Sequence, residues 1–259
     1  MTVLDRFRLD GRRFFITGGS RGLGRAMALA LAEAGADGIL VGRDVASLEQ
    51  TAADIRSLGR AAATIVADVG RPEECEKVCR RALDVHGPID ILVNNVGGRR
   101  VPTATIDLSI ATWHELLDLN LTSTFVCTKV LGKPMLERRQ GRVINIASIS
   151  GMVANRGIGG RSYETAKAAV IQFTRATAVD WAPFGVTVNA ICPGGFMTEP
   201  NVRWAHERPD VIEAFKKEIP AGDFGQPEDL GPLAVYLASD ASRYMTGAAL
   251  VIDGGYTLL

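Results

Sequence analysis

The stretch RFFITGGSRGLGRAMALALAEAG, residues 13–35, decides the fold because it joins a strand, a glycine turn and a helix. The largely apolar residues 13–17 predict a buried strand, and the alanine- and leucine-rich residues 22–34 predict a helix. Gly18, Gly22 and Gly24 lie in the turn, at a G-x-x-x-G-x-G spacing. Glycine lets backbone N–H groups approach a phosphate, and the following helix points its positive end at the same place. We therefore predict a phosphate cradle, with a plain glycine-rich turn as the simpler alternative.

The rest of the chain repeats this alternation of strand and helix. We expect strands at 13–17, 38–42, 62–67, 89–93, 142–147, 186–191 and 249–252, and helices at 22–34, 45–58, 72–86, 110–138, 163–182 and 227–237. Several of these strands are nearly all apolar, which suits a sheet that helices cover on both faces. The sequence thus predicts an α/β fold of the Rossmann type, a doubly wound seven-stranded parallel sheet.

The chain has no internal repeat, low-complexity segment or linker, so we expect one domain over residues 1–259. Residues 194–226 interrupt the alternation. They form a long polar segment bracketed by glycine and proline, and loops of this length in compact domains are often binding elements. We therefore expect a substrate loop or lid there.

Charge and composition exclude several classes of protein. The 29 Lys and Arg balance the 29 Asp and Glu, and no long run of one sign occurs, so we expect neither a nucleic-acid partner nor a membrane partner. Residues 1–13 lack the apolar core of a signal peptide, and no apolar run reaches membrane-spanning length. We expect a cytoplasmic protein.

The four cysteines are too few and too scattered for a disulfide scaffold. Cys75 and Cys79 are four residues apart on an expected helix and could supply two ligands of a metal site. No His or Cys follows them at zinc spacing. We therefore expect no metal, and reduced cysteines throughout.

Cofactor choice depends on the end of the second strand, where the sequence reads ILVGRD. An acidic residue there would bind an adenosine ribose and repel a 2′-phosphate. Arg43 and Arg21 instead suit a phosphate dianion. Asp44 is the counter-evidence, but it is better placed to cap the helix that begins at Val45. We expect NADP(H) in preference to NAD(H).

Polar residues also follow the third and fourth strands. Asp68 can accept a hydrogen bond from an adenine amino group, and Pro72 at the expected start of the next helix leaves Asp68 too early to be its cap. In NNVGG, residues 94–98, the asparagines can tie neighbouring strands together and the glycines let the backbone pass close to a cofactor.

With these pieces placed, the chain resembles the short-chain dehydrogenase/reductase family over essentially its whole length. The matching motifs are TGGSRGLG (17–24), DV (68–69), NNVG (94–97), the asparagine of LNLTS (120), NIAS (145–148), YETAK (163–167), PGGFMT (193–198) and DGG (253–255). Only NNVG departs from the family pattern, with Val96 where alanine is usual.

The resemblance implies a catalytic set of Asn120, Ser148, Tyr163 and Lys167. It also implies a cofactor site whose members follow the strand ends: Gly18, Ser20, Arg21, Gly22, Leu23, Gly24, Arg43, Asp68, Val69, Asn95, Val96, Gly97, Tyr163, Lys167, Pro193, Gly194, Phe196 and Thr198. In the family, assembly into homotetramers through the fourth and fifth helices and the last strand is usual.

The chemistry explains why these residue types are needed. Hydride transfer to a carbonyl leaves negative charge on oxygen, which Ser148 would hold and Tyr163 would protonate. A free tyrosine has a pKa of about 10, and a neighbouring ammonium on Lys167 would lower it. Asn120 would fix a water that links Lys167 to solvent. Ser150 is a second hydroxyl nearby, which we place on the substrate side.

The substrate is less defined. Several arginines fall in the expected substrate walls and could attract a carboxylate or phosphate, or face solvent instead: Arg99, Arg100, Arg156, Arg161 and Arg203. The motifs resemble those of gluconate 5-dehydrogenases, which predicts that a secondary alcohol and a ketone are interconverted on a sugar acid or other small polar carbonyl compound. They also resemble 3-oxoacyl-carrier-protein reductases. A third alternative is a non-catalytic NADP(H)-binding sensor or scaffold.

Overall fold

The computed structural model describes residues 2–98, 100–155 and 160–258. Its centre is one seven-stranded sheet in the order β3-β2-β1-β4-β5-β6-β7, and each neighbouring pair is parallel. The strands are β1 (Arg13–Thr17), β2 (Asp37–Gly42), β3 (Ala62–Val66), β4 (Ile91–Asn94), β5 (Gly141–Ile146), β6 (Val186–Pro193) and β7 (Ala249–Ile252).

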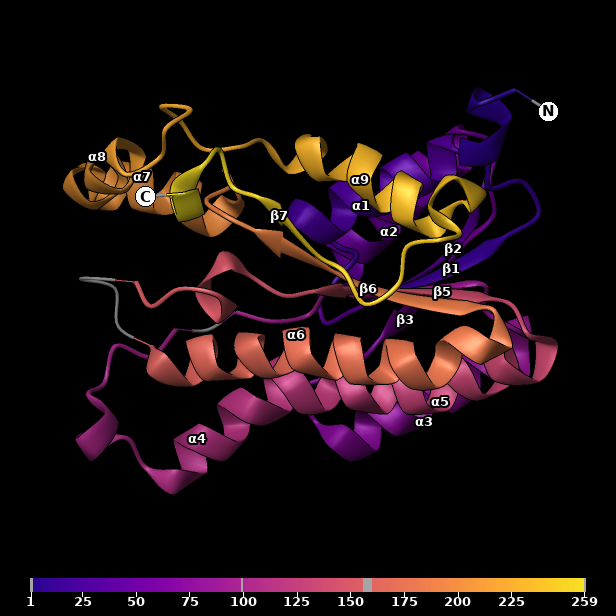
Figure 1. Cartoon of the computed structure of the whole chain (residues 1–259), viewed down its shortest axis with the longest axis horizontal. Coiled ribbons are helices and arrows are strands. Elements are labelled where there is room, and N and C mark those ends of the chain that lie inside the picture. Colours follow the sequence, from indigo (N-terminus) through magenta and orange to yellow (C-terminus); the bar gives the residue numbers. More distant parts are fainter. Residues whose placement is uncertain (1, 99, 156–159, 259) are drawn as a thin grey trace.

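The helices cover both faces of this sheet (Figure 1). They are α1 (Gly22–Glu33), α2 (Val45–Ser57), α3 (Pro72–His86), α4 (Ile110–Leu117), α5 (Ser123–Arg138), α6 (Arg161–Trp181), α7 (Glu199–Glu207), α8 (Pro209–Lys217) and α9 (Gly231–Ala238). In Figure 1, α1, α2 and α9 lie above the sheet, and α3, α4, α5 and α6 lie below it. The predicted doubly wound α/β fold is confirmed.

The first strand shows why both faces are covered. Phe14 and Ile16 are fully buried in the core cluster shared with α1 and α9. Phe15, which points to the opposite face of the strand, is fully buried in the cluster shared with α3 and α5. Positions 14, 15 and 16 therefore each require an apolar residue, and burial of these three side chains stabilises both layers.

The strand order positions the site. The order reverses between β1 and β4, so the crossover helices diverge to opposite faces at that point. In open α/β sheets, ligands bind in the crevice that opens there, beyond the carboxyl ends of the strands.

The helix expected over residues 110–138 is confirmed in its bounds, but it is not one regular α-helix. A π-helical turn, Asp118–Thr122, separates α4 from α5 and contains Asn120. Two side chains, one in this turn and one directly after it, bond to carbonyls four residues earlier: Asn120 Nδ2 donates to Leu116 O at 2.9 Å, and Ser123 Oγ donates to Leu119 O at 2.8 Å. Such bonds widen the helical turn, and single π turns occur frequently at functional sites.

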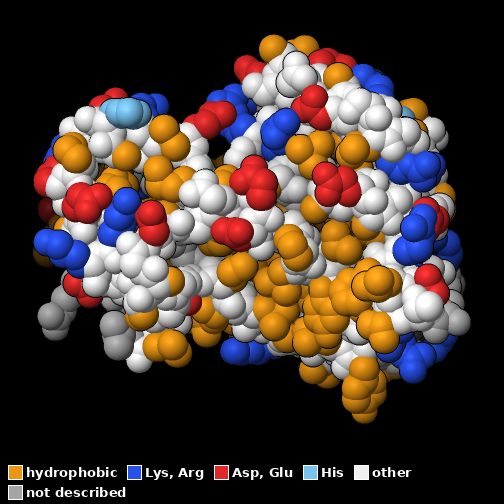
Figure 2. All heavy atoms as spheres, turned by 90° about the horizontal axis from the view of Figure 1, so that it is seen from above, with side chains coloured by type: hydrophobic (Ala, Val, Ile, Leu, Met, Phe, Trp, Pro, Cys, Tyr) orange, Lys and Arg blue, Asp and Glu red, His pale blue; other side chains and the backbone are white. Residues whose placement is uncertain are grey.

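The expectation of a loop over residues 194–226 was wrong, because α7 and α8 occupy much of this segment. Its role as a substrate element or lid stays a prediction. Each has a proline at its start, where the fixed φ of proline favours a helix. Ile212 of α8 packs with Ile219 and Phe224 in a small separate core. Figure 2 shows that this part of the chain forms a lobe that a notch separates from the body.

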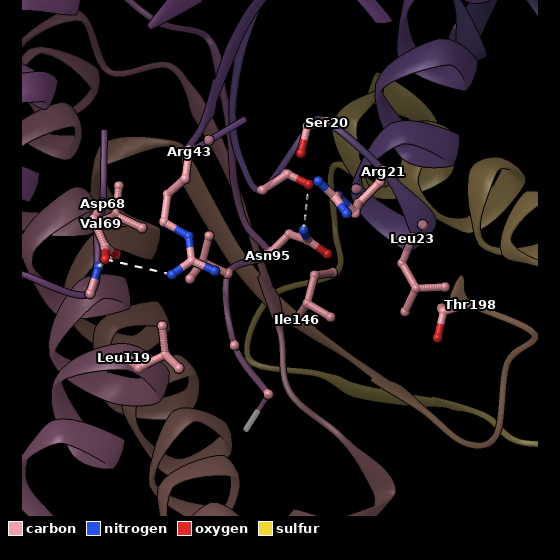
Figure 3. Close-up of a pocket in the computed structure, with 18 of the residues that line it drawn as sticks. Ser20, Arg21, Leu23, Arg43, Asp68, Val69, Asn95, Leu119, Ile146 and Thr198 are labelled. Atoms are coloured by element: carbon pink, nitrogen blue, oxygen red, sulfur yellow. Dashed lines mark hydrogen bonds and ion pairs between the residues drawn. The ribbon is translucent and has the colours of Figure 1, made fainter. Parts of the chain in front are cut away.

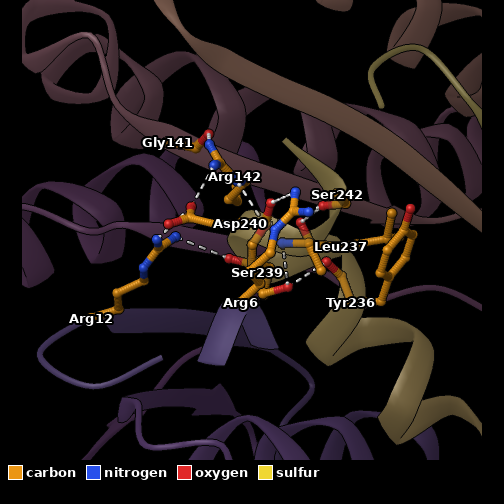
Figure 4. Close-up of polar contacts among 11 residues, drawn as sticks. Arg6, Arg12, Gly141, Arg142, Tyr236, Leu237, Ser239, Asp240 and Ser242 are labelled. Atoms are coloured by element: carbon orange, nitrogen blue, oxygen red, sulfur yellow. Dashed lines mark hydrogen bonds and ion pairs between the residues drawn. The ribbon is translucent and has the colours of Figure 1, made fainter. Parts of the chain in front are cut away.

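The edge of the sheet opposite the crevice carries an ion-pair network (Figure 4). Arg142, at the amino end of β5, is buried and lies 3.0 Å from the Asp240 carboxylate. Arg12, just before β1, lies 2.7 Å from the same carboxylate oxygen. One carboxylate thus holds two guanidiniums at the amino ends of two strands.

Among the described residues, no helix is both long enough and apolar enough to cross a membrane.

Candidate active site

A cleft of about 1260 Å³ lies beyond the carboxyl ends of the strands. Of the residues proposed from sequence, those that line it come from all the central strand ends: Gly18, Ser20, Arg21, Gly22, Leu23, Gly24, Arg43, Asp68, Val69, Asn95, Val96, Gly97, Ser148, Tyr163, Lys167, Pro193, Gly194 and Thr198. Figure 3 shows how Arg43, Asn95 and Thr198 approach this cleft from separate segments. Two proposed residues, Asn120 and Phe196, are outside its lining.

The glycine turn at the start of α1 fits a phosphate. Gly18 has a φ of 68° and Gly22 a φ of 52°, which favour glycine. A Cβ on Gly24 would lie 2.1 Å from Gly18 O, so only glycine permits this approach. The N-cap residue of α1, Arg21, makes no side-chain capping bond. The first-turn N–H groups are therefore available to bind an anion.

Arg21 and Arg43 lie on the two sides of the ribose end of the cleft (Figure 3). Arg21 is 3.1 Å from Glu199 and 4.0 Å from Asp44, and Arg43 is 3.7 Å from Asp68. Each is thus held by exposed ion pairs, which contribute little to stability and are easily exchanged for a phosphate. Arg71 also lines the cleft, a cation that the sequence patterns did not point to.

The acidic residues near these arginines have different roles. Asp44 accepts a hydrogen bond of 2.8 Å from Ser47 N and is the N-cap of α2, as the sequence predicted. Its capping bonds to Ser47, opposed by some desolvation, hold the pKa of Asp44 below its usual value. Asp68 is not a helix cap: α3 begins at Pro72, and the Asp68 carboxylate accepts from Gly70 N at 3.0 Å. It lines the cleft and remains a candidate adenine ligand.

The two asparagines at the end of β4 tie strands together. Asn94 Nδ2 donates to Asn145 Oδ1 at 2.9 Å, across to β5. Asn95 Nδ2 donates to Thr17 O at 3.0 Å, across to β1. The Asn95 bond bridges β4 and β1, where the strand order reverses, and the Asn94 bond ties β4 to its other neighbour, β5.

Tyr163 and Ser148 meet inside the cleft. Ser148 follows β5, Tyr163 lies in the first turn of α6, and both residues line the cleft. Ser148 Oγ also accepts from Ser150 N at 3.1 Å, which orients the hydroxyl. Burial raises the pKa of Tyr163 above its usual value, and the bond to Ser148 and the charge of Arg100 oppose that rise.

Lys167 lies near the ring of Tyr163. Its Nζ is 5.8 Å from the centre of the Tyr163 ring and donates to Ile146 O at 2.7 Å. The side chain is buried, and burial lowers the pKa of Lys167 to about 8. The charge of Arg100 lowers the pKa of Tyr163, and the lowering expected from Lys167 stays a prediction.

Asn120 acts as a clamp in this structure. Its Oδ1 accepts from Gly98 N at 2.7 Å, and its Nδ2 donates to Gly98 O at 3.1 Å. A Cβ on Gly97 would lie 2.7 Å from Lys167 Nζ and 3.0 Å from Asn120 Oδ1, so both groups crowd this glycine. Asn120 therefore holds the loop after β4 against the lysine.

Other proposed residues are placed differently. The Phe196 side chain is buried in the main core, and Phe196 does not line the cleft. Ser150 Oγ accepts hydrogen bonds from Arg100 and from Asn155 Nδ2, the latter at 3.0 Å. Arg99 and Arg156 lie outside the described residues.

Arg100 stands out among the arginines that the sequence suggested. Its guanidinium carbon is 4.5 Å from the centre of the Tyr163 ring, within cation–π distance. It also bonds to Ser150 and lies 3.7 Å from the buried Glu164 carboxylate. Arg161 belongs to the same group, since it lies 2.8 Å from Glu164. The sequence alone gave no reason to single out Arg100, because these contacts join three separate segments.

Comparison with known proteins agrees with this geometry. Residues 18–257 match the family model described as enoyl-(acyl carrier protein) reductase. The chain is 39% identical over 253 residues to a galactitol 2-dehydrogenase (L-tagatose-forming) of Cereibacter sphaeroides, covering 97% of each chain. It is 37% identical over 250 residues to a 3-oxoacyl-[acyl-carrier-protein] reductase of Synechocystis, covering 94% of this chain and 96% of the relative.

A solved structure is similar over the full length. It is a gluconate 5-dehydrogenase from Burkholderia cenocepacia J2315 in complex with NADP and tartrate, with 36% identity, a TM-score of 0.91 and 100% coverage of both chains. The seven-stranded sheet of this chain agrees with the fold of this match. The chain belongs to the short-chain dehydrogenase/reductase family, whose members are oxidoreductases acting on alcohol and ketone substrates.

Proposed function

We propose that this protein is an NADP(H)-dependent dehydrogenase that interconverts a secondary alcohol and a ketone, with Tyr163 as the general acid and base. The observation that carries the proposal is that Ser148, Tyr163 and Lys167 line one cleft together with the glycine cradle. Binding alone would not require a partly buried phenol, a buried lysine and a serine hydroxyl at one place.

The chain's own residues account for the proton and for the charge. A bound nicotinamide dinucleotide would supply or accept the hydride. Ser148 would hold the substrate oxygen by a hydrogen bond as negative charge develops on it. In reduction Tyr163 would donate its proton to that oxygen, and in oxidation it would accept one. Lys167 and Arg100 would offset the charge of the phenolate, whose formation burial alone disfavours.

Substitution of Tyr163 separates an enzyme from a cofactor-binding sensor. Purified protein is mixed with NADPH and a panel of ketones, or with NADP⁺ and the matching alcohols, and turnover is followed at the nicotinamide absorbance. Tyr163→Phe is expected to lower kcat by at least about 100-fold, the usual contribution of a general acid, while NADPH affinity stays within a few-fold. A wild type that binds NADPH but turns over no substrate would support the sensor.

For the substrate, we propose a sugar acid or a related small polyhydroxy compound. The supporting feature is Arg100, which lies against the Tyr163 ring and bonds to Ser150 at the substrate side. A guanidinium has five donors, so its contacts with Ser150 and Glu164 are compatible with an additional bond to a substrate carboxylate. One relative is named for galactitol, a neutral polyol, and one for gluconate, a sugar acid, so both classes of substrate are consistent with the comparisons.

A comparison of two substrates tests the role of Arg100. Arg100→Gln keeps a hydrogen-bonding group but removes the charge. We expect the KM for gluconate to rise about 10-fold or more, the effect of one charged hydrogen bond, with little change for galactitol. Equal effects on both substrates would mean that Arg100 acts only on the tyrosine. A wild type that prefers β-ketoacyl thioesters to both would favour the 3-oxoacyl reductase alternative.

The preference for NADP(H) rests on Arg43 and Arg21. Arg43→Ala and Arg21→Ala are expected to raise the NADPH dissociation constant by about 10-fold or more, as loss of a charge-assisted bond does, and to change NADH binding little. Arg208→Ala is the matched control, because Arg208 is an exposed arginine paired with Asp210 in the α7–α8 lobe. Equal losses for both dinucleotides would contradict recognition of the 2′-phosphate.

We also propose that the chain forms a homotetramer through α5, α6 and the β7 region. Large apolar side chains are exposed on these elements: Phe125, Val179, Phe184 and Val251. Exposed groups of this size often mark interfaces. Light scattering coupled to size exclusion measures the mass, and a monomer of 27.7 kDa at micromolar concentration would contradict the proposal.

A further inference from the structure

The structure brings together three cysteines that lie far from the reacting groups. Cys75 and Cys79 are on α3, and Cys127 is on the facing helix α5. Cys127 Sγ lies 3.4 Å from Cys75 Sγ and 3.6 Å from Cys79 Sγ, and all three sulfur atoms are within 4.8 Å of one another. All three are free thiols and fully buried. The sequence analysis found only the first two, because the third comes from another helix.

We propose that these cysteines, named here the thiol triad, form a binding site for one copper(I) ion. Soft thiolate sulfur selects copper(I), zinc or iron–sulfur clusters. Structural zinc and iron–sulfur clusters use four protein ligands. Among the described residues, no fourth His, Cys, Asp or Glu joins the triad. Of these candidates, copper(I) is the ion whose coordination three sulfur ligands can complete.

The distances suit such an ion with small movements. Metal–thiolate bonds of about 2.3 Å place the three sulfurs of a trigonal site about 4 Å apart. The two shortest sulfur–sulfur distances, 3.4 and 3.6 Å, are slightly below this, so outward movement of the thiols by a few tenths of an ångström suffices. The α3–α5 contact supplies the rigidity, since Cys75 and Cys79 are one helical turn apart and share one face.

The surroundings favour a monovalent ion. The triad packs among apolar side chains such as Val78, Ala82 and Leu131. A buried site of this kind tolerates little net charge. Copper(I) with two thiolates and one thiol releases two protons and leaves a single negative charge. The positive amino end of α3, in whose first turns Cys75 lies, offsets part of that charge.

A surface groove lies on the same helix pair. It has a volume of about 370 Å³ and is lined by residues that include Arg80 and Lys129, which follow Cys79 and Cys127 closely in the chain. The triad is separate from the proposed hydride site, since none of its cysteines lines the active-site cleft. Copper binding is therefore measurable independently of turnover.

The test uses reduced, full-length protein kept under anaerobic conditions. Copper(I), supplied alone as its acetonitrile complex, is titrated in and competed with bicinchoninate. We expect one equivalent to bind, with an ultraviolet thiolate-to-copper charge-transfer band and an X-ray absorption spectrum showing three sulfur neighbours at about 2.3 Å. We also expect a higher melting temperature for the loaded protein, as for any ligand that binds the folded state.

Two variants decide the assignment. Cys127→Ser should weaken copper(I) binding by more than about 100-fold, beyond the loss typical of an outer-sphere residue. Cys192→Ser, which removes a buried cysteine outside the triad, should bind as the wild type does. If Cys127→Ser does not fold, Cys79→Ser replaces it, with circular dichroism as the check. Absence of the charge-transfer band, binding below about 0.2 equivalents, or equal binding by the triad variants would show that the cysteines are core residues only.

Discussion

Removal of the Asp240 carboxylate is expected to destabilise the protein without affecting the cleft. Asp240 holds Arg142 at 3.0 Å and Arg12 at 2.7 Å (Figure 4). Asp240→Ala would leave two guanidiniums near one another, one of them buried, with no carboxylate between them. Burial is the main cause that lowers the pKa of Arg142, and the charge of Arg12 lowers it further. The two cations therefore already repel one another.

The magnitude follows from what remains around Arg142. Removing one partner of a buried ion pair costs about 3–5 kcal/mol. The side chain of Asp240 is 55% exposed, and Arg142 keeps its bonds to Gly141 O and Ser239 O at 3.0 and 3.5 Å. We therefore expect a smaller loss in the free energy of unfolding, about 2 kcal/mol. For a chain of this length that corresponds to a fall in melting temperature of about 4–8 °C.

The assay is thermal unfolding at neutral pH, with turnover as the second readout. Asp210→Ala is the matched control, because Asp210 pairs with Arg208 at the exposed surface and should change nothing measurable. Arg12 and Arg142 hold the pKa of Asp240 below 3.8 despite its partial burial. The stabilisation is therefore present above about pH 4 and is lost as the pH falls through the folded-state pKa, so wild type and variant should converge in acid. Equal melting temperatures at pH 7 would refute the reasoning.

Three further predictions concern the cleft and the helix layer. Lys167→Met should abolish turnover yet raise the melting temperature at pH 7, because burial lowers the pKa of the lysine from 10.5 to about 8. The gain in melting temperature should shrink as the pH rises from about 8 to 10.5, where the unfolded lysine also loses its proton. A gain that does not change with pH would contradict this prediction. Gly24→Ala should cost about 1–3 kcal/mol and greatly weaken NADPH binding, measured by fluorescence titration, because its Cβ would lie 2.1 Å from Gly18 O. Gly132→Ala should lower the melting temperature, because its Cβ would lie 2.1 Å from the Trp181 ring, and adding Trp181→Leu should restore it.

The parts of the fold that sequence predicted are those that local chemistry determines. The strand at 13–17 and the helix start at Pro72 agree with the structure because an apolar run and a proline act within a few residues. The cap at Asp44 is equally local. Helix ends were less accurate: α6 begins at Arg161, two residues before the expected start.

The missed features all depend on contacts between distant segments. The π turn is stabilised by Asn120, whose amide binds Gly98, 22 residues away in the chain. The lobe helices escaped prediction because their surfaces are polar and their apolar side chains pack on the far C-terminal segment, as Phe215 does on the ring of Tyr256 at 5.0 Å. The sequence also did not predict that Cys127 lies beside Cys75 and Cys79, because α3 and α5 meet only in the folded chain.

The two edges of the sheet differ in how charge is compensated, and this difference supports the proposed site. At the amino edge, Arg12 and Arg142 share a carboxylate, so each charge there has a partner. At the carboxyl edge, Lys167 is buried, and in the part of the chain that the structure describes no carboxylate pairs with it. Burial also disfavours the phenolate of Tyr163. A fold selected for stability alone would not retain these costs. They become useful only when a reaction moves a proton and negative charge through this cleft, so the unfavourable groups themselves argue for catalysis at this edge.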